Sequence, residues 1–331
     1  MQKFLFTNDY ITARRAYYTN DICDVREGVV IGKEDQALFD VDSLLARRFG
    51  KVIESKGVEI NTKEILKEWE EDIKNRAFRL HQKPEFVIIK VGSRSDSTLY
   101  VNNKIKKAKK LDIEPYLLNL DIDITQHQLN LTMSQIDRPT ILQLPLPAHL
   151  DATEALSYLK PELDMDGLTN HQKGLLVSGS PNAMIPATAK GVMKIIESLT
   201  SVEALRVLII SRSQLIGKPL AQLVLQKDGV PVVMHSRVPK LNLYSEMKKA
   251  DVIVTGCAKR KIFNHTHFNN MNQIIIDCSM EKVDGIDNVG DVDKEDILLH
   301  TRNCIASGYG HTGPATILGL LDNVVKFYEM E

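Results

Sequence analysis

Two side chains suited to acid–base chemistry, Tyr100 and Lys104, lie four residues apart in a segment that follows a predicted strand ending at Gly92. On a helix, residues at positions i and i+4 share one face, so a phenol and an amine at this spacing can meet the same small ligand. Surface Tyr–Lys pairs have the same spacing and are the more common case. The spacing alone therefore leaves both interpretations open.

Two further polar residues stand at a predicted strand end and a predicted turn. Gln143 opens the segment QLPLPAHL within a predicted strand over 140–145, and Asp166 lies in LDMDGL directly before Gly167. An amide at a strand end and an aspartate before a turn glycine are both common structural features. Each residue alone is compatible with a structural role and with a binding site.

A third group of candidate residues follows the predicted strand over 205–211. The turn Ser211, Arg212, Ser213 leads into a predicted helix that opens near Gly217. A helix N-terminus that follows a strand directs backbone N–H groups toward a pyrophosphate, as in a Rossmann unit. Many strand–turn–helix units contain such residues, so this motif is weak when it is taken alone.

Seven short β-branched runs supply the strands that would position these residues. They cover 86–92, 115–120, 140–145, 205–211, 230–236, 251–256 and 273–279. Runs of this kind that alternate with longer amphipathic stretches predict βαβ units and parallel sheets. The two series of runs are separated by residues 161–203, where Pro, Gly, Ser and Asn predict a loop between lobes before a helix that starts near 188.

The fold expected from this pattern is α/β with two lobes. We expect an N-terminal αβ catalytic domain at residues 59–160, joined by a returning C-terminal helix within 314–331. A Rossmann-type parallel-sheet domain that binds a nucleotide is expected at 161–313. Residues 1–58 form an N-terminal extension of unknown role, with a predicted helix over 40–55.

Composition excludes several classes of protein. The chain has 331 residues, 42 basic and 43 acidic, which suits about two domains and gives no broad field for nucleic acid. No segment is apolar enough for a signal peptide or a membrane span, and the four scattered cysteines indicate reduced thiols. We therefore expect a cytoplasmic protein without membrane contact. His235, His265 and His267 lack carboxylates at ligand spacing, and no metal site is predicted.

Taken together, the motifs resemble those of the methylenetetrahydrofolate dehydrogenase/methenyltetrahydrofolate cyclohydrolase family. YVNNK, QLPLP, LDMDGL, SRSQLIGKP and GDVD appear in the order of the family's YxxxK, VQLPLP, KDVDG, VGRSxxVGxP and GDV signatures, over about residues 60–326. The resemblance implies oxidation of 5,10-methylenetetrahydrofolate with NADP and hydrolysis of the methenyl product to 10-formyltetrahydrofolate. It also implies a homodimer paired through the nucleotide lobe.

The resemblance implies a role for each candidate residue. Lys104 would assist proton transfer as water adds to the methenyl carbon, and burial beside a cationic folate would favour its neutral amine. Gln143 would hold that amine, and Tyr100 would lie against the folate. Asp166 would bind the pterin, because a carboxylate recognises an aminopyrimidine edge directionally. The NADP site would comprise Ser211, Arg212, Ser213, Gly217 and Ser236.

The cofactor half departs from the family pattern at several positions. Ser211 stands where a glycine usually opens the turn, IPATAKG (185–191) replaces PCTPxG, and IDCSM (276–280) replaces a VDVGI-like strand end. Tyr309 and His311 occupy positions usually held by Pro and Gly, and added side chains can narrow a nicotinamide pocket. A cyclohydrolase with a degenerate nucleotide site and a non-catalytic folate-binding protein are therefore alternatives. The Arg212 guanidinium favours NADP over NAD.

Overall fold

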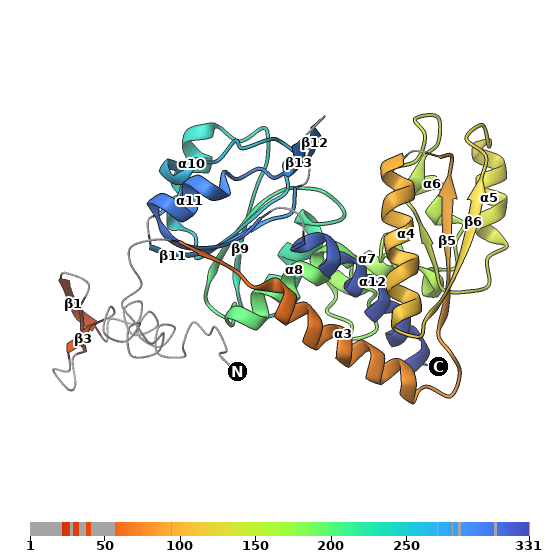
Figure 1. The fold of residues 1–331 in the computed structure, drawn as a ribbon, viewed down its shortest axis with the longest axis horizontal. Coiled ribbons are helices and arrows are strands. Elements are labelled where there is room, and N and C mark those ends of the chain that lie inside the picture. Colours follow the sequence, from red (N-terminus) through yellow and green to blue (C-terminus); the bar gives the residue numbers. More distant parts are fainter. Residues whose placement is uncertain are drawn as a thin grey trace.

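The computed structural model describes residues 57–330 apart from positions 94, 270, 280, 284–285 and 308–309, together with three short strands near the N-terminus. Those strands, β1 (Ile22–Arg26), β2 (Val29–Gly32) and β3 (Leu38–Asp40), form an antiparallel sheet. The helix predicted over 40–55 lies outside the described residues except at Asp40. Two α/β lobes make up the rest (Figure 1).

The first lobe is built on a three-stranded parallel sheet. Its strands are β5 (Glu85–Val91), β6 (Glu114–Leu120) and β7 (Thr140–Leu142), in the order β6-β5-β7. Helices α4 (Ser95–Lys110), α5 (Gln126–Ser134) and α6 (Ala152–Ser157) connect and flank the strands. The buried apolar side chains of β5 explain why the sequence there reads as a nearly continuous hydrophobic run.

The second lobe contains a six-stranded parallel sheet in the order β4-β14-β11-β10-β8-β9. Five of its strands come from residues 206–306: β8 (Arg206–Ile210), β9 (Val230–Met234), β10 (Val252–Thr255), β11 (Met271–Asp277) and β14 (Arg302–Ala306). The sixth, β4 (Val58–Glu59), comes from the start of the described chain and pairs with β14. The residues at the boundary between extension and first domain therefore belong to the sheet of the second lobe.

Side chains along these strands alternate between two cores. Val207 and Ile209 pack into the larger core that continues into the first lobe, whereas Leu208 and Ile210 pack into a smaller core on the other face. Helices α9 (Gly217–Leu225), α10 (Lys240–Lys249) and α11 (Lys294–His300), the single turn η2 (His265–His267) and the hairpin β12 (Glu281–Val283)–β13 (Ile286–Val289) complete this lobe. The predicted strands and the α/β fold class are confirmed.

Four helices join the two lobes. They are α3 (Thr62–Arg79), α7 (Asn170–Val177), α8 (Ala187–Leu199) and α12 (Thr312–Glu329) (Figure 1). The sequence predicts only loop before 188, and this prediction is wrong for α7 and for the short turn η1 (Pro161–Leu163). The Thr169 hydroxyl accepts the Gln172 N–H at 3.3 Å, so α7 begins with a side-chain cap that its polar composition conceals.

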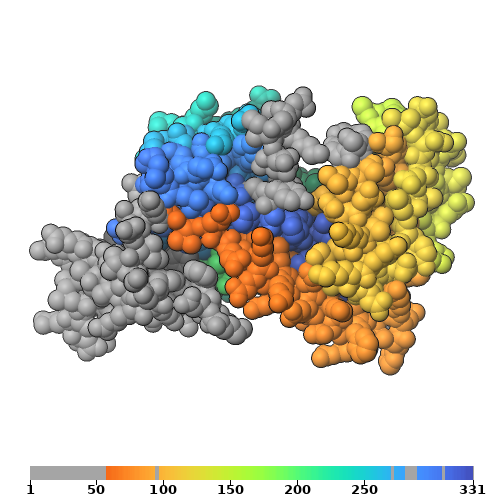
Figure 2. Space-filling view, viewed as in Figure 1, coloured from red at the N-terminus to blue at the C-terminus, as the bar shows by residue number. Residues whose placement is uncertain are grey.

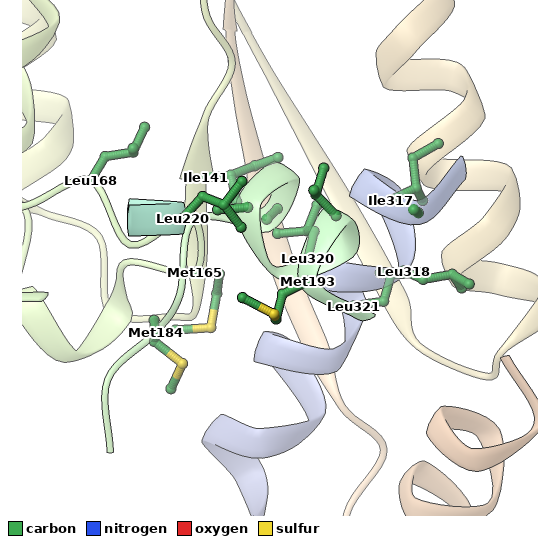
Figure 3. Close-up of a cluster of buried hydrophobic side chains, with 14 of the residues drawn as sticks. Ile141, Met165, Leu168, Met184, Met193, Leu220, Ile317, Leu318, Leu320 and Leu321 are labelled. Atoms are coloured by element: carbon green, nitrogen blue, oxygen red, sulfur yellow. The ribbon is translucent and has the colours of Figure 1, made fainter. Parts of the chain in front are cut away.

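Helices α8 and α12 approach closely because glycines lie at their contact. A Cβ atom on Gly191 would lie 2.7 Å from the Ala315 backbone, and one on Gly319 would lie 2.5 Å from the Ala187 carbonyl oxygen. Around this contact, Met165, Met184 and Met193 gather beside the leucines of α12 (Figure 3). Figure 2 shows the blue second lobe and the orange and yellow first lobe with darker blue α12 between them. The helix pair therefore sets how the two lobes meet.

We expect Gly191→Ala to lower the free energy of unfolding by about 1–3 kcal/mol, because the added methyl group forces α8 away from α12. Gly174→Ala in α7 is the matched control, since nothing lies within 4 Å of its Cβ position. That change should be neutral or stabilising by up to about 1 kcal/mol. Urea unfolding midpoints measure both, and equal shifts of the two variants would contradict the close-approach argument.

Candidate active site

Lys104 and Gln143 meet at the carboxyl edge of the first sheet. Lys104 lies on α4 and is 4% exposed, and its Nζ donates a hydrogen bond of 3.0 Å to Oε1 of Gln143. The Gln143 backbone is fixed to β5 through a bond to the Ile89 carbonyl, and its Nε2 donates to the Leu144 carbonyl at 2.7 Å. The amide is therefore oriented with its oxygen toward the lysine, as the resemblance implies.

Asp166 reaches the same place from a different segment. Thr140 of β7 forms a parallel bridge with Asp164, and the Met165 N–H donates to the Thr140 carbonyl at 3.0 Å. Two residues beyond that bridge, Asp166 lies level with the end of β7, where Gln143 follows. Gly167 then turns the chain with φ +65°, and a Cβ atom there would lie 2.1 Å from the Met184 carbonyl oxygen.

Burial shifts the protonation of both charged groups. Burial lowers the pKa of the Lys104 ammonium, and the attraction of the Asp166 carboxylate offsets part of that shift. Burial raises the pKa of Asp166, and Lys104 opposes this shift in turn. The neutral amine is thereby favoured more than in a surface lysine, which suits an acid–base role near neutral pH.

Tyr100 lies on the same face of α4 as Lys104. The Lys104 Nζ is 5.1 Å from the centre of the Tyr100 ring, within the range of a cation–π contact. The Tyr100 hydroxyl shares a hydrogen bond with Thr316 of α12, and burial raises its pKa to about 12, so it stays a neutral phenol. The structure therefore brings together all four first-lobe residues that the sequence singles out.

The sequence interpretation missed Asp164, the other aspartate of LDMDGL. It is 1% exposed, and its Oδ2 accepts the Thr169 N–H at 2.6 Å. Burial raises its pKa to about 6, against the hydrogen bonds from Thr169 that lower it. The sequence feature that could have identified it is its position two residues before Asp166. In an extended segment this spacing puts both carboxyl groups on one side. Asp164 organises the turn that carries Asp166.

The candidate nucleotide residues lie at one edge of the second sheet. Ser211, Arg212 and Ser213 follow β8, Ser236 follows β9, and these strands are adjacent and parallel. The carboxyl ends of neighbouring parallel strands are where α/β sheets bind ligands. Arg212, Ser213 and Ser236 are exposed there. Gly217 begins α9, and its Cβ position lies 2.1 Å from the Ser211 carbonyl oxygen, so the turn needs a glycine there.

Most departures from the family pattern have partners inside the protein. The Ser211 hydroxyl bonds that of Ser213 at 3.3 Å and lies against Gly256. The Ser279 hydroxyl donates to Asp291 at 2.8 Å and accepts the Ala258 N–H at 3.0 Å. His311 contacts the Thr62 hydroxyl at 2.9 Å and the Glu59 carboxylate at 3.1 Å. Tyr309 lies outside the described residues.

One group of three potential metal ligands gathers in the described part of the chain: His265, Asp296 and His300, within 4.8 Å of one another. The Asp296 carboxylate contacts Nδ1 of His265 at 2.8 Å and Nδ1 of His300 at 3.1 Å. The two rings stack with 29° between their planes. The cluster joins η2 to α11 through these contacts of the two imidazole rings with Asp296. His267 instead packs its ring against Tyr244.

The pKa of Asp164 predicts a pH dependence of stability. Because its folded pKa of about 6 lies above the ordinary value of 3.8, the stability that it contributes is present below about pH 4 and is lost as the pH rises through 6. Asp164→Asn should therefore gain about 2–3 kcal/mol relative to the unmodified protein between pH 4 and pH 7. Urea unfolding across this range measures the difference, with the exposed Asp137→Asn as control. Parallel pH profiles for all three proteins would refute the assignment.

Comparison with known proteins places this geometry in a family. Residues 60–166 match the model of the tetrahydrofolate dehydrogenase/cyclohydrolase catalytic domain, and residues 186–331 match that of the tetrahydrofolate dehydrogenase/cyclohydrolase NAD(P)-binding domain. The bifunctional protein FolD of Rickettsia bellii is 32% identical over 273 residues, covering 81% of this chain and 95% of that protein. No helix among the described residues is long and apolar enough to cross a membrane.

Solved structures agree with these matches. The bifunctional FolD methylenetetrahydrofolate dehydrogenase/cyclohydrolase of Campylobacter jejuni has a TM-score of 0.77 and 25% identity, covering 82% of this chain and 99% of its own. The Trypanosoma brucei enzyme, solved with NADP and an inhibitor, has a TM-score of 0.76 and 25% identity, covering 84% and 99%. The resemblance seen in the motifs is confirmed, and this chain belongs to the tetrahydrofolate dehydrogenase/cyclohydrolase family.

Proposed function

We propose that this protein oxidises 5,10-methylenetetrahydrofolate with NADP and hydrolyses the resulting methenyl cation to 10-formyltetrahydrofolate. The observation that carries the proposal is the buried amine of Lys104, bonded to Gln143 and within the field of Asp166. Burying an amine lowers the stability of the folded protein unless the group is fully compensated. Buried titratable groups with shifted pKa values therefore concentrate at functional sites.

In the hydrolytic step, Lys104 moves the proton. Water adds to the methenyl carbon and loses a proton to the neutral amine, and the amine returns this proton to the folate nitrogen as the carbon–nitrogen bond of the ring breaks. The hydroxyl left on that carbon loses its proton to solvent and becomes the formyl carbonyl, so one proton is released overall. The Gln143 oxygen holds the Nζ in place while its charge changes, because a carbonyl oxygen accepts from both the amine and the ammonium. Asp166 stabilises the transient ammonium electrostatically.

Substrate orientation falls to Asp166 and Tyr100. The Asp166 carboxylate accepts hydrogen bonds from the aminopyrimidine edge of the pterin, and the partly exposed Tyr100 ring lies beside the folate, one helical turn from Lys104. The phenol remains neutral because its pKa is about 12. The methenyl carbon would therefore lie between the amine of α4 and the carboxylate of the 164–168 turn.

The residues at the edge of the second sheet fit NADP. Arg212, Ser213 and Ser236 offer a guanidinium and two hydroxyls, which are groups that bind a 2′-phosphate, and the α9 N-terminus lies beside them. The cofactor supplies the two-electron oxidation when bound. Ser211 turns its hydroxyl toward Ser213 and Gly256, inside the turn. This favours the bifunctional enzyme over the alternative with a degenerate nucleotide site.

The proposal includes the predicted division into a catalytic and a nucleotide-binding domain, a cytoplasmic location and a homodimer paired through the nucleotide lobe. The exposed apolar edge of the second sheet supports such pairing. Strand β9 is at the end of the strand order, and Val230 and Val233 are 46% and 41% exposed. Sedimentation of the unmodified protein should give a particle of twice the 37.3 kDa chain mass. Val233→Lys places a charge on the edge strand and should reduce the measured mass to that of one chain. A monomer before any substitution would exclude the dimer.

We expect Lys104→Met to lower the rate of methenyl hydrolysis by roughly 10²–10⁴-fold, because the proton relay is lost while the apolar stem still fills its site. Folate binding should persist. Lys106→Met is the matched control, since Lys106 is exposed on the same helix. The decay of methenyl absorbance measures turnover. Retention of rate within about tenfold would refute the role of the amine.

Arg212→Ala should raise the KM for NADP roughly ten- to a hundredfold, since a charge-assisted hydrogen bond contributes about 1.5–3 kcal/mol. The KM for NAD and the rate of methenyl hydrolysis should change little, because neither requires a 2′-phosphate contact. Exposed Arg79→Ala in α3 serves as control. The absorbance of the reduced nicotinamide measures turnover with either nucleotide. An equal rise in KM for both nucleotides would remove Arg212 from the 2′-phosphate site.

A further inference from the structure

Asn323 lies in the middle of α12, between the charged Asp322 and the apolar Val324, and is fully buried. Its Nδ2 donates two hydrogen bonds of 2.8 Å, one to the Met165 carbonyl and one to the Ile185 carbonyl. Its Oδ1 accepts a bond of 2.8 Å from Nζ of Lys190 on α8. Both amide hydrogens and the oxygen are therefore used, and none of these partners belongs to α12.

The two carbonyls that Asn323 binds flank the turn that carries Asp166. Met165 directly precedes Asp166, and Ile185 directly follows Met184, whose carbonyl oxygen faces Gly167. The Met165 N–H is already bound to Thr140 of β7, so the peptide groups on both sides of Met165 are fixed, one to the sheet and one to α12. A shift of the Met165 carbonyl would move the Asp166 backbone with it.

A buried charge fixes which way the Asn323 amide points. Lys190 forms an ion pair with Asp322, which also binds Arg76 of α3. A flipped amide would place its NH2 group against the Lys190 ammonium and its oxygen against two carbonyl oxygens, losing all three hydrogen bonds. Lys190 therefore keeps the Asn323 donors directed at the two carbonyls.

We propose that Asn323 is a positioning residue for the folate reaction, which holds Asp166 at its place beside Lys104 by binding the Met165 and Ile185 carbonyls from α12. This inference rests on the proposed function, in which Asp166 binds the pterin. Helix α12 thereby supports two parts of the site from one face, since Thr316, which bonds Tyr100, lies seven residues before Asn323.

The test compares Asn323→Asp with Lys326→Met. The first keeps an acceptor for Lys190 and removes both donors. The second, one turn further along α12, removes a bond of 2.9 Å to the Ala183 carbonyl and leaves Met165 untouched. We expect Asn323→Asp to raise the KM for methenyltetrahydrofolate at least tenfold and to lower kcat by a smaller factor, because Asp166 binds the pterin before the reaction and stabilises the Lys104 ammonium during it. Lys326→Met should leave both constants within twofold.

A KM within twofold of the unmodified protein in folded Asn323→Asp, or an equal rise in Lys326→Met, would overturn the proposal. Circular dichroism and urea unfolding establish that each variant is folded. If Asn323→Asp does not fold, Asn323→Ser replaces it, since the shorter side chain cannot span to either carbonyl and adds no charge. Absence of methenyl hydrolysis in the unmodified protein would instead refute the proposed function, so the two failures are distinguishable.

Discussion

The site depends on keeping one amine out of water. Removing the Lys104 ammonium from solvent costs several kcal/mol unless other groups compensate. Gln143 supplies an acceptor at 3.0 Å, the Tyr100 ring lies 5.1 Å away, and Asp166 supplies the opposing charge. These groups come from α4, from the end of β7 and from the 164–168 turn. Their convergence on one nitrogen explains why short segments so far apart in the chain must be placed accurately.

The second lobe is organised by buried carboxylates instead. Asp277 accepts hydroxyl bonds from Thr255 at 3.1 Å and Ser307 at 2.9 Å, so it ties together the carboxyl ends of β10, β11 and β14. Asp291 accepts the backbone N–H groups of Cys257 and Lys259 at 2.7 and 2.8 Å. Burial and the neighbouring Asp291 raise the pKa of Asp277. Hydrogen bonds accepted by these two buried carboxylates thus form a network that shapes the loops at the ligand-binding edge of this sheet.

The strands and fold class were predictable because each strand is a short β-branched run buried on a parallel sheet. The approach of Lys104 to Gln143 was not predictable from spacing, since it joins residues 39 positions apart. It followed only from the resemblance to a family. The buried roles of Asp164 and Asn323 were not predicted, because a polar residue among apolar ones can equally mark the end of a helix or strand. Only its hydrogen-bond partners distinguish the two cases. Their partners, Thr169 and the carbonyls at 165 and 185, are set by tertiary contacts.

The departures from the family's glycines show how a ligand edge can tolerate added side chains. Ser211 replaces a glycine without filling the outer face of the turn, because Gly217 and Gly256 leave room on either side of it. His311 is likewise held by Thr62 and Glu59, and Glu59 is also bound by Lys294 of α11. The loop before α12 is thereby linked to the edge strand β4. Helix α12 also contacts Tyr100 and the turn that carries Asp166. The contacts of His311 at the start of α12 therefore connect the sheet of the second lobe to the folate site through this helix.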